Sequence, residues 1–152
     1  MENKNFHFGE ALAEELKEHK VRFMSEERGD STVFTLPLPA ENLATIFVRL
    51  IIDNEDGDSK LRYYLVYDVP EKKWPAMLRV LNKCNANYRY ICLSLDDEGD
   101  VGAALDFKIY DSGESLVDQA LTMAITFSDI LDKCIPDIMR IVWASDDEND
   151  TS

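Results

Sequence analysis

The sequence predicts a single α+β domain in which an antiparallel β-sheet packs against α-helices. Three features lead to this fold class: segments with apolar side chains at every second position, amphipathic segments with helical spacing, and short acidic turns between neighbouring alternating segments. The predicted element order is α-β-β-β-α-β-β-α. Strands joined by short polar turns pair antiparallel, and the helices that interrupt them cover one face of the sheet.

The first predicted helix covers residues 8–19. Apolar side chains recur at every fourth position of this segment, and acidic and basic side chains fill most of the positions between them. Residues 21–24 are interpreted as a short extended piece. Residues 26–30, which are charged apart from Gly29, are interpreted as a turn.

Five segments alternate in the manner of strands. They cover residues 32–38, 44–53, 61–67, 88–95 and 101–109. Pro37 has no backbone N–H, so we expect its strand to lie at an edge of the sheet or to end there. The acidic turns at 54–58 and 96–100 each contain a glycine and join two consecutive strands into a hairpin.

Two further helices are predicted at residues 71–85 and 115–144. Pro75 suits the first turn of the former helix. Ser115 begins a segment that resembles a capping box at the start of the latter. Pro136 removes a backbone hydrogen bond and crowds the preceding turn, so we expect it to kink the last helix.

The last predicted helix carries two apolar stripes side by side. One stripe includes Leu121 and Leu131, and the other includes Met123, Phe127 and Ile130. One interpretation places both stripes on the sheet as a single broad apolar face. The other gives the first stripe to the sheet and part of the second to a partner protein. The sequence leaves both interpretations open.

Charge and composition exclude several classes of function. The 16 basic and 30 acidic residues give a net charge of −14 at pH 7, whereas nucleic acids and anionic membranes are bound by clusters of Lys and Arg. No apolar run is long enough to span a bilayer, and no segment resembles a signal peptide. Three cysteines without a CxxC pair are typical of reduced thiols in a cytoplasm, and we expect them to be buried and inert.

Residues that could carry catalysis or bind metal do not form a recognisable set. His7 and His19 offer no triad with serine or cysteine, and no phosphate-binding glycine loop is present. The acidic turns resemble EF-hand loops, but with Gly57 at position 6 the acidic positions 1 and 12 fall on Ile52 and Tyr63. We therefore expect solvated hairpin turns, with no metal and no cofactor.

Residues 69–95 are the most specific part of the sequence. This segment contains Val69-Pro70-Glu71-Lys72-Lys73-Trp74-Pro75, Leu81-Asn82-Lys83-Cys84-Asn85 and Leu93-Ser94-Leu95-Asp96. The last helix contains Asp132-Lys133-Cys134-Ile135-Pro136-Asp137-Ile138. Together these motifs and the element order resemble the YbjN family over about residues 8–143.

The resemblance implies a fold like that of the type III secretion chaperones, commonly dimeric, and a regulatory role in sensory transduction. It brings no catalytic residues. Asn82 and Asn85 match an asparagine pair of the family, and we interpret both as structural, because asparagine near a helix end can bond backbone groups.

The sequence favours a non-enzymatic protein-interaction module, chaperone-like or regulatory, whose partner it does not identify. Aromatic and arginine side chains are enriched at binding patches. On the sheet face turned away from the helices we expect a partner-binding surface of Phe47, Arg49, Ile51, Arg62, Tyr64 and Tyr90. Two alternatives stay open: an enzyme or small-ligand binder with an unrecognised pocket, and an acidic decoy that mimics nucleic acid.

The organisation predicted for the chain is one domain over residues 1–152. Its ordered core covers about 6–144, and the acidic tail 145–152 is expected to be disordered. The surplus of apolar residues predicts a homodimer, because monomers seldom expose a large apolar patch.

Overall fold

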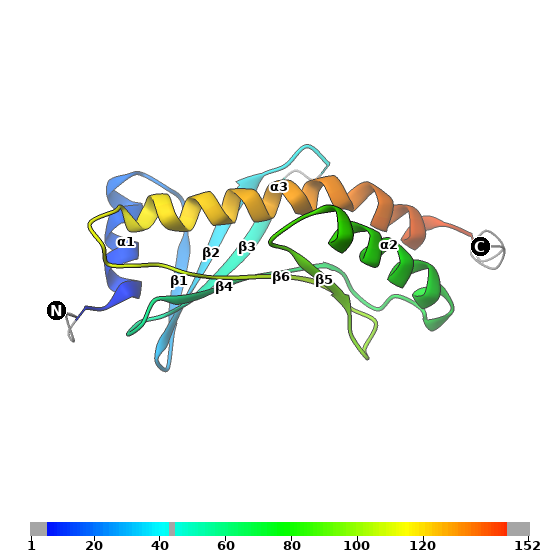
Figure 1. Ribbon diagram of the computed structural model, residues 1–152, viewed down its shortest axis with the longest axis horizontal. Coiled ribbons are helices and arrows are strands. Elements are labelled where there is room, and N and C mark those ends of the chain that lie inside the picture. Colours follow the sequence, from blue (N-terminus) through cyan, green and yellow to red (C-terminus); the bar gives the residue numbers. More distant parts are fainter. Residues whose placement is uncertain (1–5, 43–44, 146–152) are drawn as a thin grey trace.

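The computed structural model describes residues 6–42 and 45–145, which form a six-stranded antiparallel sheet with three helices on one face (Figure 1). The fold class predicted from the sequence is confirmed. The acidic tail, apart from Ser145, lies outside the described residues. Within those ranges no helix is long and apolar enough to cross a membrane.

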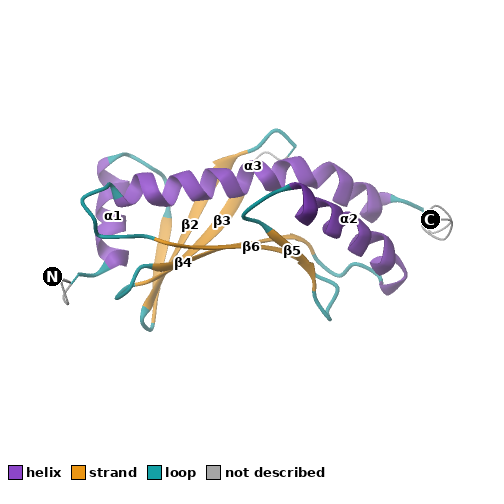
Figure 2. Ribbon diagram, in the orientation of Figure 1, coloured by secondary structure: helices purple, strands orange, loops and turns teal. Residues whose placement is uncertain are grey.

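The helices and strands follow each other as α-β-β-β-β-α-β-β-α. The helices are α1 (Phe8–Glu18), α2 (Trp74–Asn87), which the short 3-10 helix η1 (Glu71–Lys73) precedes, and α3 (Leu116–Trp143). The strands are β1 (Met24–Arg28), β2 (Ser31–Pro39), β3 (Thr45–Asp53), β4 (Asp58–Val66), β5 (Cys92–Leu95) and β6 (Val101–Lys108). In the sheet the strands lie in the order β1-β2-β3-β4-β6-β5 (Figure 2).

Strand β1 is the element that the sequence prediction missed, so the predicted order is one strand short. Strand β1 pairs with β2 from Met24 opposite Thr35 to Arg28 opposite Ser31. It includes residues 26–28, which the sequence assigns to a turn. All five residues of β1 are exposed. An edge strand held by backbone hydrogen bonds alone needs no apolar alternation, and its charged side chains discourage pairing with other chains.

The position of Pro37 also differs from the prediction. Strand β2 continues to Pro39 and lies between β1 and β3, so it is not an edge strand. However, β1 pairs with β2 only as far as Thr35, and beyond that residue β2 has β3 as its neighbour on one side. The proline therefore lies in a part of β2 that β1 does not cover, where a missing N–H interrupts no ladder with β1.

The predicted strand 88–95 is shorter in the structure, where β5 begins at Cys92. Tyr90 has a φ of 72°, a left-handed conformation that no strand residue adopts. The adjoining strand edge is closed by α2: the side-chain amide of Asn85 accepts from Leu93 N at 2.7 Å and donates to Leu93 O at 2.9 Å. The amide takes the place of a neighbouring strand. Asn85 thus has a structural role, as expected, but it pairs with β5 and does not end α2.

The core lies between the sheet and the three helices. Strand residues alternate strictly, so that Val48, Leu50 and Ile52 of β3 are fully buried while the residues between them face away from the helices. Helix α3 runs along the sheet from α1 to α2 (Figure 1). Both of its apolar stripes are covered, and Phe127 of the second stripe has an exposed fraction of 0%. The structure therefore favours the broad-face interpretation of α3 over the one that reserves part of it for a partner.

Helix α3 is held at both ends by charged side chains from other elements. At its N-terminus Glu15 Oε1 accepts from Ser115 Oγ at 3.0 Å and from Val117 N at 3.3 Å. At its C-terminus the buried Lys73 donates from Nζ to Val142 O at 2.6 Å and to Ala144 O at 2.9 Å. An anion at the N-terminus and a cation at the C-terminus both complement the helix dipole.

Candidate functional site

The sheet face turned away from the helices is called the outward face here. Its centre consists of Phe47, Arg49, Ile51, Lys60, Arg62, Tyr64, Gly102, Ala104 and Asp106, with Cys92 and Ser94 on β5. Five of the six residues predicted for a partner-binding surface lie on it: Phe47, Arg49, Ile51, Arg62 and Tyr64. Phe47 and Tyr64 are 58% and 49% exposed, which is high for large hydrophobic side chains.

Tyr90, the sixth predicted residue, does not belong to the outward face. It is exposed, but it lies in the bend between α2 and β5, outside the sheet. The prediction extended the alternation of β5 backwards through Tyr88 and Tyr90, whereas α2 continues to Asn87 and the chain must then turn. Its placement on the sheet is therefore wrong.

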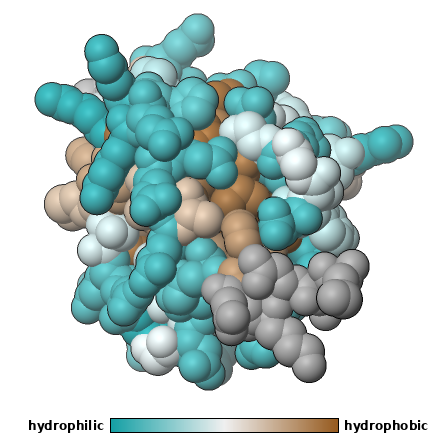
Figure 3. All heavy atoms as spheres, turned by 90° about the vertical axis from the view of Figure 1, so that its left-hand side faces the viewer, coloured by the Kyte–Doolittle hydropathy of each residue, from teal (hydrophilic) through white to brown (hydrophobic). Residues whose placement is uncertain are grey.

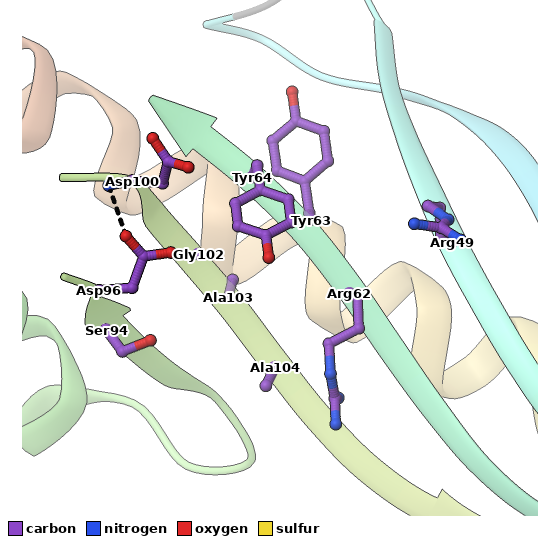
Figure 4. A pocket seen from close by; sticks show the side chains of 10 residues that line it. All are labelled: Arg49, Arg62, Tyr63, Tyr64, Ser94, Asp96, Asp100, Gly102, Ala103 and Ala104. Atoms are coloured by element: carbon purple, nitrogen blue, oxygen red, sulfur yellow. Dashed lines mark hydrogen bonds between the residues drawn. The ribbon is translucent and has the colours of Figure 1, made fainter. Parts of the chain in front are cut away.

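A hollow of about 380 Å³ opens on the outward face beside Tyr64 (Figure 4). Its floor is made of the small residues Ser94, Gly102 and Ala104. The Tyr64 ring lies over Gly102, where an added Cβ would come within 3.4 Å of the ring. The ring of Tyr64 also stacks on that of Tyr67, with centroids 5.5 Å apart. The hollow thus exists because small side chains lie next to an aromatic wall.

Arginine side chains line one side of this hollow. Arg49 of β3 and Arg62 of β4 are directly opposite each other in the strand register. The Nη1 atom of Arg62 donates to Asp106 Oδ1 at 2.7 Å and to Leu61 O at 2.8 Å. Arg49 has neither a hydrogen bond nor an ion pair within the described part of the chain. Of the two guanidinium groups, only that of Arg62 has a carboxylate partner among the described residues.

Two acidic side chains from the turn between β5 and β6, Asp96 and Asp100, line the opposite end of the hollow (Figure 4). Asp96 Oδ1 accepts from Glu98 N and from Asp100 N, both at 2.9 Å. Asp100 Oδ1 accepts from Asp68 N at 3.0 Å. The carboxylates of Asp96, Glu98 and Asp100 lie close enough together to contact one cation, but they are exposed or half-buried, and two of them bond backbone N–H groups.

The other acidic hairpin turn is built in the same way. Asp53 Oδ1 accepts from Asp56 N at 3.0 Å and from Glu55 N at 2.9 Å, and these hydrogen bonds hold the pKa of the Asp53 carboxyl below its usual value. Gly57, with a φ of 81°, supplies the left-handed residue of the turn. Both Asp/Gly segments are therefore hydrogen-bonded hairpin turns, as predicted.

His7, Glu10 and Glu27 form a second group whose ligand atoms lie close together. His7 Nδ1 accepts from Glu10 N at 2.9 Å and so caps the N-terminus of α1. His7 Nε2 lies 3.7 Å from Glu27 Oε1. The histidine therefore serves to begin a helix, a role that its position just before the apolar periodicity could have indicated.

The three cysteines do not share one environment. Cys84 of α2 and Cys134 of α3 are buried. Burial, together with a hydrogen bond between its thiol and Cys84, raises the pKa of Cys134 to about 12. Cys92 is exposed on the outward face, so the prediction that all three are buried is wrong for this residue. It faces outward because its β-strand neighbour Leu93 takes the buried position.

Exposed hydrophobic side chains also occur away from the centre of the sheet. Trp143, at the end of α3, is 77% exposed and lines a groove with Ile135, Pro136 and Met139. A hollow beside β1 is lined in part by Met24 and Phe47. Figure 3 looks onto the end of the molecule that carries α1, where most of the surface is hydrophilic and hydrophobic residues form a narrow strip. Met24 ends a short extended piece without alternation, and Trp143 lies outside both apolar stripes of the last helix, so no sequence pattern marks either residue.

Comparison with known proteins identifies relatives of the chain. A family model described as "Putative bacterial sensory transduction regulator", YbjN, matches residues 9–137. The crystal structure of YbjN from E. coli has a TM-score of 0.51 at 13% sequence identity, covering 88% of this chain and 90% of that one. A chain of the heterodimeric ExoU–SpcU complex from the type III secretion system of Pseudomonas aeruginosa has a TM-score of 0.43 at 20% identity, covering 68% and 81%. A search of curated proteins finds no match.

The likeness to the E. coli structure extends over most of both chains and concerns the fold. The family model covers far more than half of the 152 residues, from α1 to the last turns of α3. This chain therefore belongs to the YbjN family.

Proposed function

We propose that the protein is a non-enzymatic interaction module, regulatory or chaperone-like, that binds another polypeptide on its outward face. The observation that carries this proposal is the exposure of Phe47 and Tyr64 beside Arg49 and Arg62 on one side of the sheet. Aromatic residues and arginine are the types that contribute most at protein interfaces. The family description as a regulator is consistent with such a role.

The same surface supports binding better than catalysis. Asp96 is engaged by backbone N–H groups of its own turn, and Asp100 by the N–H group of Asp68 in the loop after β4. The nucleic-acid decoy has little support, because cations interrupt the acids on the outward face. We further propose a single domain located in the cytoplasm.

A homodimer stays a prediction, and the apolar area available to it is smaller than the sequence indicated. Phe127 and Ile130 of α3 are buried within their own chain, and Met123 is half-buried. The outward face is the surface that we propose for a second copy, with Phe47 and Tyr64 at the contact. Binding of a different polypeptide there would compete with self-association.

Site-specific photo-crosslinking in producing cells tests the proposal. Phe47 and Tyr64 are replaced one at a time by p-benzoylphenylalanine, and Ile125, an exposed hydrophobic residue of α3 on the helical side, serves as the matched control. We expect adducts with one polypeptide from positions 47 and 64 and none from position 125. Adducts of twice the 17.4 kDa chain mass would identify the homodimer. Equal crosslinking from all three positions, or none, contradicts the proposed surface.

A further inference from the structure

The centre of the outward face carries more basic than acidic side chains, although the chain as a whole is acidic. Arg49, Lys60 and Arg62 lie on adjacent strands at this centre, in a protein with a net charge of −14. Lys108, at the end of β6, adds no excess charge, because it pairs with Asp58 at 3.9 Å. Asp106 is the one acid at the centre of this face as defined above. A local excess of cations on an acidic protein marks a place where an anion would be accepted.

Arg49 and Arg62 lie directly opposite each other, and the described residues provide a partner for only one of them. Like charges directly opposite each other on neighbouring strands destabilise a sheet. Arg62 is oriented by Asp106 and by the Leu61 carbonyl, but Arg49 is exposed and makes no ion pair within the described residues. An anion placed between the two guanidinium groups would turn their repulsion into attraction for a shared partner.

The hollow beside Tyr64 gives such an anion a defined neighbourhood. The hollow adjoins both arginines, small residues form its floor, and the Tyr64 ring forms an apolar wall (Figure 4). Its volume of about 380 Å³ is sufficient for side chains of a docked segment and is small for a folded domain. A ligand that brings an anionic group together with apolar atoms would therefore contact both kinds of surface.

We propose that the outward face binds an acidic segment of a partner polypeptide, whose carboxylates lie between Arg49 and Arg62 while adjacent side chains pack on Phe47 and Tyr64. This inference rests on the proposed function and specifies the chemistry of the partner. Guanidinium groups bind carboxylates through paired, charge-assisted hydrogen bonds.

A carboxylate fits this surface better than a nucleic-acid backbone does. Asp96 and Asp100 line the same hollow, and Asp106 lies beside Arg62. These acids would repel a continuous row of phosphates, which needs a track of cations along its length. A flexible peptide can place one carboxylate between the two arginines and turn its other side chains away from the acids at the far end, whereas the phosphates of a nucleic-acid backbone follow one another at fixed, short intervals.

Titration of the 15N-labelled full chain with an end-capped octaglutamate peptide tests the inference. We expect saturable amide shifts on β3, β4 and β6 around Arg49 and Arg62. Arg49→Gln should weaken binding roughly tenfold, and Arg49→Lys should weaken it less, because lysine keeps the charge. Arg140→Gln is the matched control, since this exposed arginine of α3 pairs with Asp137 and its loss changes the net charge equally. The spectra also show that each variant is folded.

Octaglutamine and the oligonucleotide dT8 complete the experiment. Stronger binding of dT8 than of octaglutamate, equal binding of octaglutamine, or equal losses in Arg49→Gln and Arg140→Gln would each overturn the acidic-segment proposal. The crosslinking experiment separates this result from the proposed function. Crosslinks from positions 47 and 64 without octaglutamate binding keep the interaction surface and reject the acidic partner, whereas missing crosslinks reject the surface itself.

Discussion

The Asn42 side chain donates from Nδ2 to the main-chain carbonyl of Asp132 at 2.9 Å. That carbonyl is the one whose helical partner is missing, because the residue four positions later is Pro136, which has no N–H. The Asp132 carboxylate in turn accepts from Glu41 N at 2.9 Å and from Asn42 N at 2.8 Å. The segment between β2 and β3 thereby supplies the hydrogen bond that the proline removes, and α3 continues to Trp143.

The relationship between Asn42 and Pro136 predicts a measurable coupling. Asn42→Ala should lower the free energy of unfolding by about 1 kcal/mol, the usual contribution of one hydrogen bond. In a Pro136→Ala background the helix regains its own N–H donor, so the cost of Asn42→Ala should shrink. Urea unfolding of the four proteins gives the coupling energy, which we expect at about 0.5 kcal/mol or more. Strictly additive effects would show that Asn42 does not substitute for the missing helical bond.

Lys73 provides a second test of how α3 is anchored. Lys73→Met keeps most of the apolar stem and removes the ammonium group that donates to Val142 O and Ala144 O. We expect a loss of about 1–3 kcal/mol, since hydrogen bonds from a buried charged donor are stronger than average. Lys83→Met, at an exposed position of α2, is the control and should change stability by less than about 0.5 kcal/mol. Thermal unfolding that is equally affected in both variants would contradict the anchoring role.

The asparagine pair of α2 predicts two different outcomes. Asn85→Ala removes both hydrogen bonds to Leu93 and uncovers the edge of β5. It should cost about 1–3 kcal/mol and promote aggregation, because a free strand edge can pair with another chain. Asn82 is exposed on the same helix, and Asn82→Ala should be close to neutral. Chemical denaturation and light scattering of the two variants distinguish a role for one asparagine from a role for both.

Thiol reactivity is expected to differ among the cysteines. In the native protein a disulfide reagent such as DTNB should modify Cys92 rapidly and leave Cys84 and Cys134 unmodified until the protein unfolds. Cys92→Ser should abolish the rapid phase. Rapid modification of more than one thiol in the native protein would contradict the burial of the other two.

The raised pKa of Cys134 predicts the direction of an alkaline effect on stability. The thiol ionises near pH 9 in the unfolded chain, whereas burial raises the pKa of Cys134 to about 12 in the folded protein. The unfolded state therefore binds fewer protons between these values, and stability falls as the pH rises above about 9, by at most about 1.4 kcal/mol per pH unit. Burial also raises the pKa of Tyr63, so the slope is compared between the wild type and Cys134→Ala. An unchanged slope in the variant would contradict the assignment.

Association can be measured by sedimentation equilibrium at low and moderate salt. A homodimer should strengthen as salt screens the repulsion between chains of charge −14. Phe47→Asp should shift the equilibrium to monomer, because the substitution places a charge at the centre of the predicted contact. A single 17.4 kDa species across the salt range would remove the homodimer prediction and leave the outward face to another polypeptide.

Most of the fold could be predicted because burial leaves a periodic trace in the sequence. Strands β2, β3, β4 and β6 alternate, since one face of each packs on the helices. Strand β1 left no such trace, because both of its faces are exposed and backbone hydrogen bonds are independent of side-chain type. Tyr90 was misplaced for the opposite reason: its alternation with Ile91 looked regular, although the chain bends there.

The candidate site could be predicted only in part. Strand parity placed Phe47, Arg49 and Tyr64 on one face, and it could equally have shown that Cys92 faces outward. The hollow could not be predicted, because it depends on the pairings of β4 with β6 and of β6 with β5, which bring small residues next to Tyr64. The anchors of α3 had no local signal, since Lys73 and Val142 are 69 positions apart.

The three anchors of α3 have a consequence for the order in which the protein is made. They join Ser115 to Glu15, Asp132 to Asn42 and Val142 to Lys73, across separations of 100, 90 and 69 residues. None can form before α3 has left the ribosome, although the whole sheet is synthesised earlier. Until then the part of the sheet that α3 covers is open in the nascent chain, and exposed apolar surface makes such a state prone to aggregation. Contacts this distant in sequence also slow folding. The growing chain is thus most vulnerable just before its last helix emerges.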